Sequence, residues 1–426
     1  MPDQNEMNNA PDKAMSTIER ILVILAGLLI CVTYSLTFSG AASISERRDV
    51  IAFADSSEYL QLTKSHEYLQ VLSSSGTAQS ELLRKTTHHV GYVVVADGFV
   101  SSLTRLVPSV SASDAAWLLS PIVGAICSVL FYLLIRVEMP AIYAAPSGLA
   151  FASAPAIWIY SSVPETWMFC CMVVLGALHL RKRLLQPWLI GLLVAVAASV
   201  NFLLLLTVVL FADNRKLLRA EISRLLQVGV FAGVFWVALL CILGAALSPA
   251  FWPTQFALTT VTFKAGLAEN LPIWSPFRWA YSGLNGWVVP FVLNQADLNF
   301  GRSAFLDTAR NIPLGLMSCI SVVSVMGATL FHYGSSYFRQ VKTVGLVPQQ
   351  IPALPAFLLL SLAATTLAAY FESFLYSPMV IPVLSLLVVR AVHAIRAPWY
   401  AYWIIAAIWL GNSSQQILAF RSLLNL

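Results

Sequence analysis

Apolar runs long enough to cross a lipid bilayer recur along nearly the whole length of this chain. A spanning helix needs about 20 apolar residues, because the hydrocarbon core is about 30 Å thick and each helical residue rises about 1.5 Å. Of the 426 residues, 58% are hydrophobic and only 11% are charged. A single soluble core cannot bury that much apolar surface, so the sequence predicts an all-α, polytopic integral membrane protein.

Nine of these runs are clear, and Pro, Trp or charged residues bound each of them at headgroup depth. They cover residues 21–42, 116–135, 141–159, 165–180, 226–247, 313–331, 355–371, 379–395 and 399–418.

The tenth run, 188–212, is long enough for one tilted span or for two short helices that turn near Asn201. Basic clusters flank it on both sides, and the positive-inside rule puts both clusters in the cytoplasm, which favours two helices. The prediction is then about eleven spans, with the N-terminus in the cytoplasm and the C-terminus outside. The same rule assigns these basic residues to the cytoplasmic side: Arg136, Arg339, Lys342, Arg390 and Arg396.

Residues 1–16 are polar and without periodicity, which predicts a flexible cytoplasmic tail, and residues 17–426 form one transmembrane domain. Two long segments of that domain, 43–115 and 248–312, fall on the outer side. Helical spacing of apolar residues in the first predicts an amphipathic helix along the membrane face, with a second at 90–107. Asp97, Gly98 and Arg105 interrupt the second helix and argue against a span. The segment 248–312 is rich in Trp and Pro, a pattern typical of interfacial helices and turns.

The first outer segment carries an unusual concentration of ionisable groups. It contains Asp55-Ser56-Ser57-Glu58-Tyr59-Leu60 and, later, His88-His89-Val90-Gly91-Tyr92. Two carboxylates and two imidazoles beside a membrane make this segment the first candidate for chemistry.

This arrangement resembles the membrane-embedded glycosyltransferases of the GT-C superfamily, which use polyprenyl-phosphate sugars. Three further segments are similar to patterns along such chains: Tyr160-Ser161-Ser162-Val163-Pro164-Glu165, Val200-Asn201-Phe202 and Leu375-Tyr376-Ser377-Pro378-Met379-Val380-Ile381-Pro382. The resemblance implies a GT-C-like helical domain with an outer-side site. It also implies inverting transfer of a sugar to a lipid, glycan or protein acceptor. The expected location is a bacterial inner membrane, with the site facing the periplasm.

The resemblance makes Asp55 the catalytic base, which would take the proton of the acceptor hydroxyl as the lipid phosphate leaves. No paired acid stands beside Asp55, so metal use is undefined, and a divalent ion would have Asp55 as its ligand. Cations are needed at the phosphate, and Lys264, Arg278, Arg302 and Arg310 are the outer-side candidates. The other candidate substrate-binding residues are Glu58, His88, His89, Tyr92, Glu165 and Tyr376.

Structural roles compete with these assignments. Asp55 and Glu58 fit a capping box, in which Asp55 caps a helix and Glu58 reaches back to it. Glu165 lies behind Pro164 at the start of a predicted span, where the helix dipole favours a carboxylate. Tyr376 fits an aromatic anchor at the interface. All six cysteines fall in apolar runs, which predicts packing residues and no disulfide framework.

Two other functions fit a charged outer face. A lipid or sugar transporter or flippase would have ionisable groups near mid-membrane or an internal repeat, and the sequence has neither. A glycan polymerase or ligase of another membrane fold would use outer-loop Arg and His residues and would not need Asp55. The net charge of +5 lies in short clusters at the ends of apolar runs, so no nucleic-acid partner is predicted.

Overall fold

The computed structural model describes residues 15–37, 90–180, 187–197, 218–242, 313–344 and 377–423, together with single positions at 276, 279, 358 and 362. All the secondary structure in this part of the chain is helical, as the sequence predicts. The helices are α2 (Thr17–Thr37), α6 (Val90–Leu106), α7 (Ala112–Glu138), α8 (Ala141–Ser153), α9 (Pro155–Ser161), α10 (Trp167–Leu180), α11 (Pro187–Ala197), α13 (Leu218–Ile242), α17 (Pro313–Val344), α19 (Ser377–Ala394) and α20 (Trp399–Leu423).

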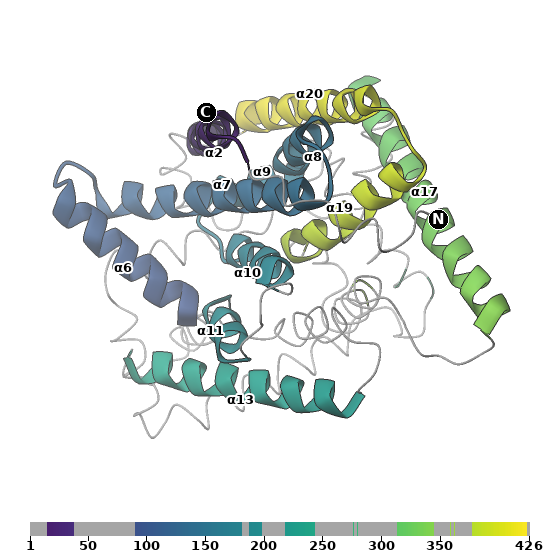
Figure 1. Ribbon diagram of the computed structural model, residues 1–426. Coiled ribbons are helices and arrows are strands. Elements are labelled where there is room, and N and C mark those ends of the chain that lie inside the picture. The colour runs from purple at the N-terminus through teal and green to yellow at the C-terminus, as the bar shows by residue number, and fades with distance from the viewer. Residues whose placement is uncertain are drawn as a thin grey trace.

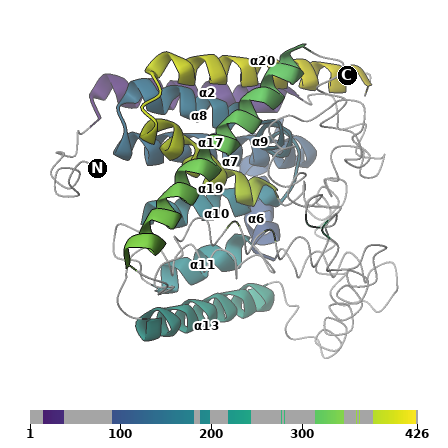
Figure 2. The same ribbon diagram turned by 90° about the vertical axis from the view of Figure 1, so that its right-hand side faces the viewer.

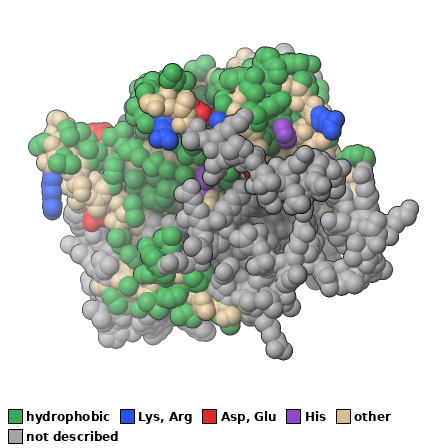
Figure 3. All heavy atoms as spheres, in the orientation of Figure 1, with side chains coloured by type: hydrophobic (Ala, Val, Ile, Leu, Met, Phe, Trp, Pro, Cys, Tyr) green, Lys and Arg blue, Asp and Glu red, His purple; other side chains and the backbone are tan. Residues whose placement is uncertain are grey.

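Three described helices, α2, α7 and α19, are long and apolar enough to cross a membrane. A fourth candidate is the pair α8 and α9, if the two are counted as one bent span. Shorter apolar stretches lie in α10, α13 and α17. The outward face of α2 is lined with exposed aliphatic side chains such as Leu22 and Leu29, and the surface in Figure 3 is largely hydrophobic over the described helices. These features are those of a membrane protein.

Helix α7 is the centre of the described bundle, with α2, α6, α8, α9 and α10 packed around it. Figure 1 shows α8, α9 and α20 on one side of α7 and α10 on the other, with α11 and α13 beyond α10. Figure 2 shows the same order of layers from the side. The rings of Phe131 on α7 and Phe151 on α8 stack with their centroids 4.4 Å apart, and both side chains are fully buried.

The predicted span at 141–159 consists of two helices joined at a bend. The chain bends by 63° between α8 and α9. Pro155 is the reason, because a proline disfavours helical backbone at the residue before it, and Ala154 has φ −58° and ψ 128°. The freed carbonyl of Ala152 accepts a hydrogen bond from the Tyr34 hydroxyl at 2.7 Å, so α2 stabilises the bend.

Two ion pairs join other helices to the C-terminal end of α7. Arg136 Nε donates to Glu19 Oε1 on α2 at 2.6 Å, and Arg390 Nε on α19 donates to Glu138 Oε2 at 2.8 Å. The sequence assigns Arg136 and Arg390 to the same side of the membrane, and their positions at one end of α7 agree with that. Ser120, in the N-terminal third of α7, is about 24 Å from Arg136 along the helix axis.

The predicted segment 188–212 is described only as α11 (Pro187–Ala197), and the predicted span 355–371 lies almost wholly outside the described residues. Residues 90–106 form the predicted helix α6, which does not qualify as a membrane span. The predicted tail 1–16, the amphipathic helix near Tyr59 and the segment 248–312 lie almost wholly outside the described residues.

Candidate functional site

Two of the predicted site residues, Tyr92 and Glu165, are described, and they lie in the same part of the bundle. The other predicted site residues lie outside the described part of the chain: Asp55, Glu58, His88, His89, Lys264, Arg278, Arg302, Arg310 and Tyr376.

Glu165 is a buried carboxylate at the start of α10, as the sequence predicts for its place in the chain. Only 1% of its surface is exposed. Its Oε1 atom accepts hydrogen bonds from Thr166 N at 2.7 Å and Thr166 Oγ1 at 3.0 Å, and its own backbone N donates to Ser120 Oγ on α7 at 3.4 Å. Thr166 provides the first helical carbonyl, which accepts from Phe169 N at 2.9 Å. The carboxylate therefore satisfies an amide at the helix N-terminus, where the helix dipole also favours a negative charge.

Tyr92 connects the first turn of α6 to this region. Its side chain is 2% exposed, and its ring meets Phe169 of α10 edge to face with the centroids 5.1 Å apart. Burial raises the pKa of the Tyr92 phenol well above its usual range, and the negative charge of Glu165 raises that pKa further. The phenol is therefore neutral at physiological pH.

The C-terminal end of α2 contacts α9, which precedes Glu165 in the sequence. Trp158 Nε1 on α9 donates to Thr37 Oγ1, the last described residue of α2, at 2.7 Å. The sequence continues from Thr37 into the segment that carries Asp55 and returns to the bundle two residues before Tyr92. The two flanks of that segment therefore contact α9, through Trp158, and α10, through Phe169, and Glu165 lies between these two residues in the sequence.

Sequence reasoning missed the supporting residues Ser120 and Trp158. Ser120 is an ordinary small residue in an apolar run, and no pattern distinguishes it from a packing residue. Trp158 lies inside an apolar run, where nothing in the sequence indicates that its indole N–H pairs with Thr37 on α2.

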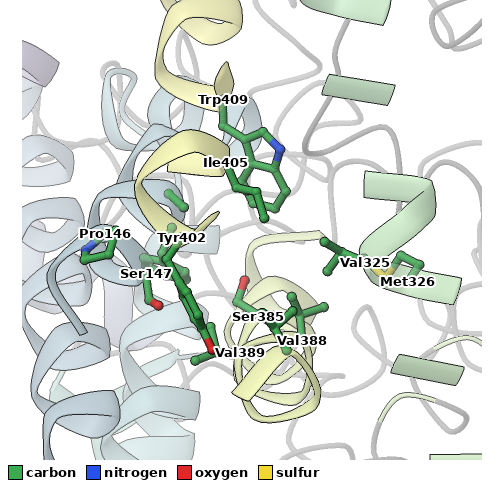
Figure 4. Close-up of a pocket in the computed structure, with 13 residues that line it drawn as sticks. Pro146, Ser147, Val325, Met326, Ser385, Val388, Val389, Tyr402, Ile405 and Trp409 are labelled. Atoms are coloured by element: carbon green, nitrogen blue, oxygen red, sulfur yellow. The ribbon is translucent and has the colours of Figure 1, made fainter. Parts of the chain in front are cut away.

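A cavity of about 40 Å³ lies between α8, α17, α19 and α20, and Figure 4 shows the side chains that line it. Its lining is almost entirely apolar, with Val325, Val388, Ile405 and Trp409 among the lining residues. Among the described residues, the hydroxyls of Ser385 and Tyr402, both of which line the cavity, have no hydrogen-bond partner.

Within the described residues, no group of three or more His, Cys, Asp or Glu side chains could hold a metal ion. The described cysteines are free thiols, and Cys127, Cys170 and Cys171 are buried. The burial of these three cysteines agrees with their predicted packing role.

Two substitutions test whether Glu165 stabilises the fold as a hydrogen-bond acceptor. Glu165→Leu removes the acceptor of the Thr166 amide, and an unpaired buried amide costs about 1–3 kcal/mol. Glu165→Gln keeps an oxygen acceptor of the same reach. We expect the Leu variant to unfold at a clearly lower temperature than the Gln variant when both are heated in detergent. Equal melting temperatures would contradict the hydrogen-bonding role.

Searches of protein-family models, curated proteins and solved structures found no match to this chain.

Proposed function

We propose that the protein is a membrane glycosyltransferase of the GT-C type. In this proposal it moves a sugar from a polyprenyl-phosphate donor to a lipid, glycan or protein acceptor. The complete chain would have about eleven spans, with the reaction on the outer face of a bacterial inner membrane.

The observation that carries the proposal is that the two flanks of the Asp55 segment contact α9 and α10, and that Tyr92 on one flank lies near Glu165. Thr37 is held by Trp158, and Tyr92 packs on Phe169 beside Glu165. This supports assigning Asp55, His88 and Glu165 to one site. The ion-paired arginines at the C-terminal end of α7 support an outer position for that site, because basic residues favour the cytoplasmic side.

The chemistry is a single displacement at the anomeric carbon. An acceptor hydroxyl attacks that carbon, its bond to the phosphate oxygen breaks, and Asp55 receives the hydroxyl proton. The lipid phosphate leaves as an anion, which Lys264, Arg278, Arg302 or Arg310 would stabilise. A single displacement with Asp55 as the base inverts the anomeric centre, as the resemblance to the GT-C enzymes implies.

The donor class is tested with the purified full chain in liposomes that contain total bacterial lipid as a source of acceptor. Radiolabelled mannose, glucose and galactose are supplied as polyprenyl-phosphate sugars or as nucleotide sugars. We expect transfer, with release of polyprenyl phosphate, from a lipid-linked donor only. Transfer from the nucleotide sugars alone would overturn the proposal, as would movement of intact donor across the bilayer without any transfer.

The same assay with EDTA tests the metal question. If Asp55 acts as a base alone, the rate is unchanged by the chelator. If Asp55 acts through a bound divalent ion, EDTA abolishes the rate and added Mg²⁺ or Mn²⁺ restores it.

A further inference from the structure

Helix α19 ends in a turn that holds an arginine in a backbone conformation normally adopted by glycine. Ala397 N donates to Val392 O at 3.2 Å, and Arg396 N donates to His393 O at 2.9 Å, which is the hydrogen-bond pattern of a Schellman cap. In this motif the residue at the position of Arg396 is left-handed, and Arg396 has φ 58°. In the described part of the chain, it is the one residue other than glycine with a positive φ.

A side chain at this position costs free energy, because its Cβ atom crowds the backbone in the left-handed conformation. Glycine is the usual residue at this position of the motif and avoids that cost. Residues held in such conformations are concentrated at binding sites, where a use for the side chain offsets the strain. The side chain of Arg396 is therefore a candidate for binding a ligand.

The charge of Arg396 is available to a ligand. Arg396 is exposed at the end of the bundle that carries the two ion pairs of α7. The arginines of those pairs, Arg136 and Arg390, are already neutralised by glutamates. Among the described residues, the guanidinium of Arg396 has no hydrogen-bond or ion-pair partner. A ligand for this group is an anion.

The turn is expected at the depth of the lipid headgroups. Helix α19 is long and apolar enough to cross a membrane, and Arg396 comes two residues after its end. The neighbouring Ile395, Trp399 and Tyr400 are exposed, and Trp and Tyr are typical of the interface between hydrocarbon and water. The anionic group that an arginine meets at this depth is the phosphate of a membrane lipid.

The apolar cavity of about 40 Å³ begins next to this turn. Val392, whose carbonyl accepts the capping hydrogen bond, lines the cavity, and so does Tyr402 in the first turn of α20. From there the lining extends two turns along each helix, to Ser385 on α19 and Trp409 on α20, which is about 10 Å (Figure 4). The cavity therefore continues from the headgroup level toward the interior of the membrane.

The character of the cavity favours a hydrocarbon ligand. The cavity is only partly enclosed, its lining is almost entirely apolar, and its volume exceeds the roughly 10–15 Å³ of one water-sized sphere. An empty apolar cavity loses van der Waals contacts, and a short stretch of a lipid chain restores them. A molecule with a phosphate at one end and a hydrocarbon chain at the other matches the turn and the cavity together.

We propose that the α19–α20 turn and the cavity next to it bind an anionic phospholipid. Its phosphate pairs with the guanidinium of Arg396, and a short stretch of one acyl chain enters the cavity. The positive-inside rule assigns Arg396 to the cytoplasmic leaflet, so the site is separate from the outer-side chemistry proposed for Asp55. The lipid site does not depend on the transferase activity.

The test compares phosphatidylglycerol with phosphatidylcholine, which can carry the same acyl chains but differ in net charge. Each lipid is titrated into the purified full chain in detergent, and bound lipid is measured by native mass spectrometry. We expect phosphatidylglycerol to bind about 5-fold more tightly, the preference that one arginine near an anionic lipid supports. Arg396→Gln should abolish this preference.

Arg396→Gly separates binding from folding. Glycine removes the charge but adopts the left-handed conformation without a steric cost. This variant should therefore melt at or above the wild-type temperature and still lose the preference for phosphatidylglycerol. Arg105→Gln is the matched control, because Arg105 is an exposed cation at the end of α6, which packs on α7, α11 and α13. It should keep the preference.

Two further measurements test the contribution of the chain. Soluble glycerol phosphate carries the anionic group without a chain, and it should not displace bound phosphatidylglycerol. Ala150 lines the cavity on α8, and Ala150→Leu would fill part of it. This variant should bind both lipids more weakly and leave the ratio of their affinities unchanged.

Several outcomes would overturn the proposal. The headgroup site is wrong if the wild type shows no preference, if either Arg396 variant keeps it, or if Arg105→Gln loses it equally. The phospholipid is the wrong ligand if glycerol phosphate competes as well as phosphatidylglycerol, or if Ala150→Leu binds both lipids as tightly as the wild type. Displacement of phosphatidylglycerol by an equal concentration of farnesyl phosphate would assign the site to an isoprenoid phosphate instead.

Discussion

Asp55→Asn is expected to lower the rate of sugar transfer by about 100- to 10,000-fold, the usual contribution of a general base. Asn has nearly the same size as Asp and caps helices about as well, but it cannot accept a proton from an attacking hydroxyl. The melting temperature in detergent should therefore stay close to that of the wild type. The rate is measured as label transferred from the lipid-linked donor under single-turnover conditions.

A matched control for this variant is Asp114→Asn at the start of α7. Asp114 Oδ2 accepts from Ser111 Oγ at 2.6 Å, and its backbone N donates to the same hydroxyl at 3.1 Å, which is a helix cap with no link to the proposed chemistry. We expect it to transfer sugar at the wild-type rate. If Asp55→Asn also transfers at that rate, then Asp55 caps a helix and the polymerase or ligase alternative gains support.

Gly124→Ala is expected to destabilise the protein by about 1–3 kcal/mol or more, the usual cost of overpacking a core. A methyl group at Gly124 on α7 would overlap the Cβ and Oγ atoms of Ser161 on α9 and lie 3.1 Å from Tyr34 Cε2 on α2. Three helices meet at this glycine, so none of them can move away without disturbing the others. The measurement is the free energy of unfolding in mixed micelles with increasing SDS.

Two further variants show whether the close approach is the cause. Gly98→Ala on α6 adds the same methyl group where no atom lies within 4 Å, and should be neutral or more stable by about 0.5–1 kcal/mol. Ser161→Gly in the Gly124→Ala background removes both overlapping atoms and should recover part of the lost stability. A Gly124→Ala variant as stable as the wild type would contradict the tight α7–α9 contact.

The apolar runs predicted most of the described helices correctly, because helix length and hydropathy are local properties. Helices α7, α13, α17, α19 and α20 each contain most or all of a predicted run, and α2 begins four residues before its predicted start. The run at 141–159 did not reveal the bend between α8 and α9, because hydropathy does not report backbone direction, and Ala154 and Pro155 are apolar residues at the bend.

For the candidate site, the sequence identified Glu165 and its place before a helix, because a carboxylate behind a proline in an apolar run is visible in the sequence itself. The chemistry proposed for Asp55 also comes from sequence, and it stays a prediction. The contacts between side chains of different helices could not be foreseen in the same way. Nothing in the sequence indicated that Trp158 would bind Thr37 or that the Tyr92 ring would pack on Phe169.

The sequence by itself determined that this is a helical membrane protein, where its helices run, and which segment concentrates ionisable groups. Only the tertiary structure decided which faces of those helices turn inward. Asn412, Ser413 and Gln416 would pass as ordinary polar residues near the end of a helix, and their burial depends on helices that are distant in sequence. Hydropathy and helix propensity depend on neighbouring residues, whereas burial, close approach and hydrogen-bond pairing depend on which helices pack together.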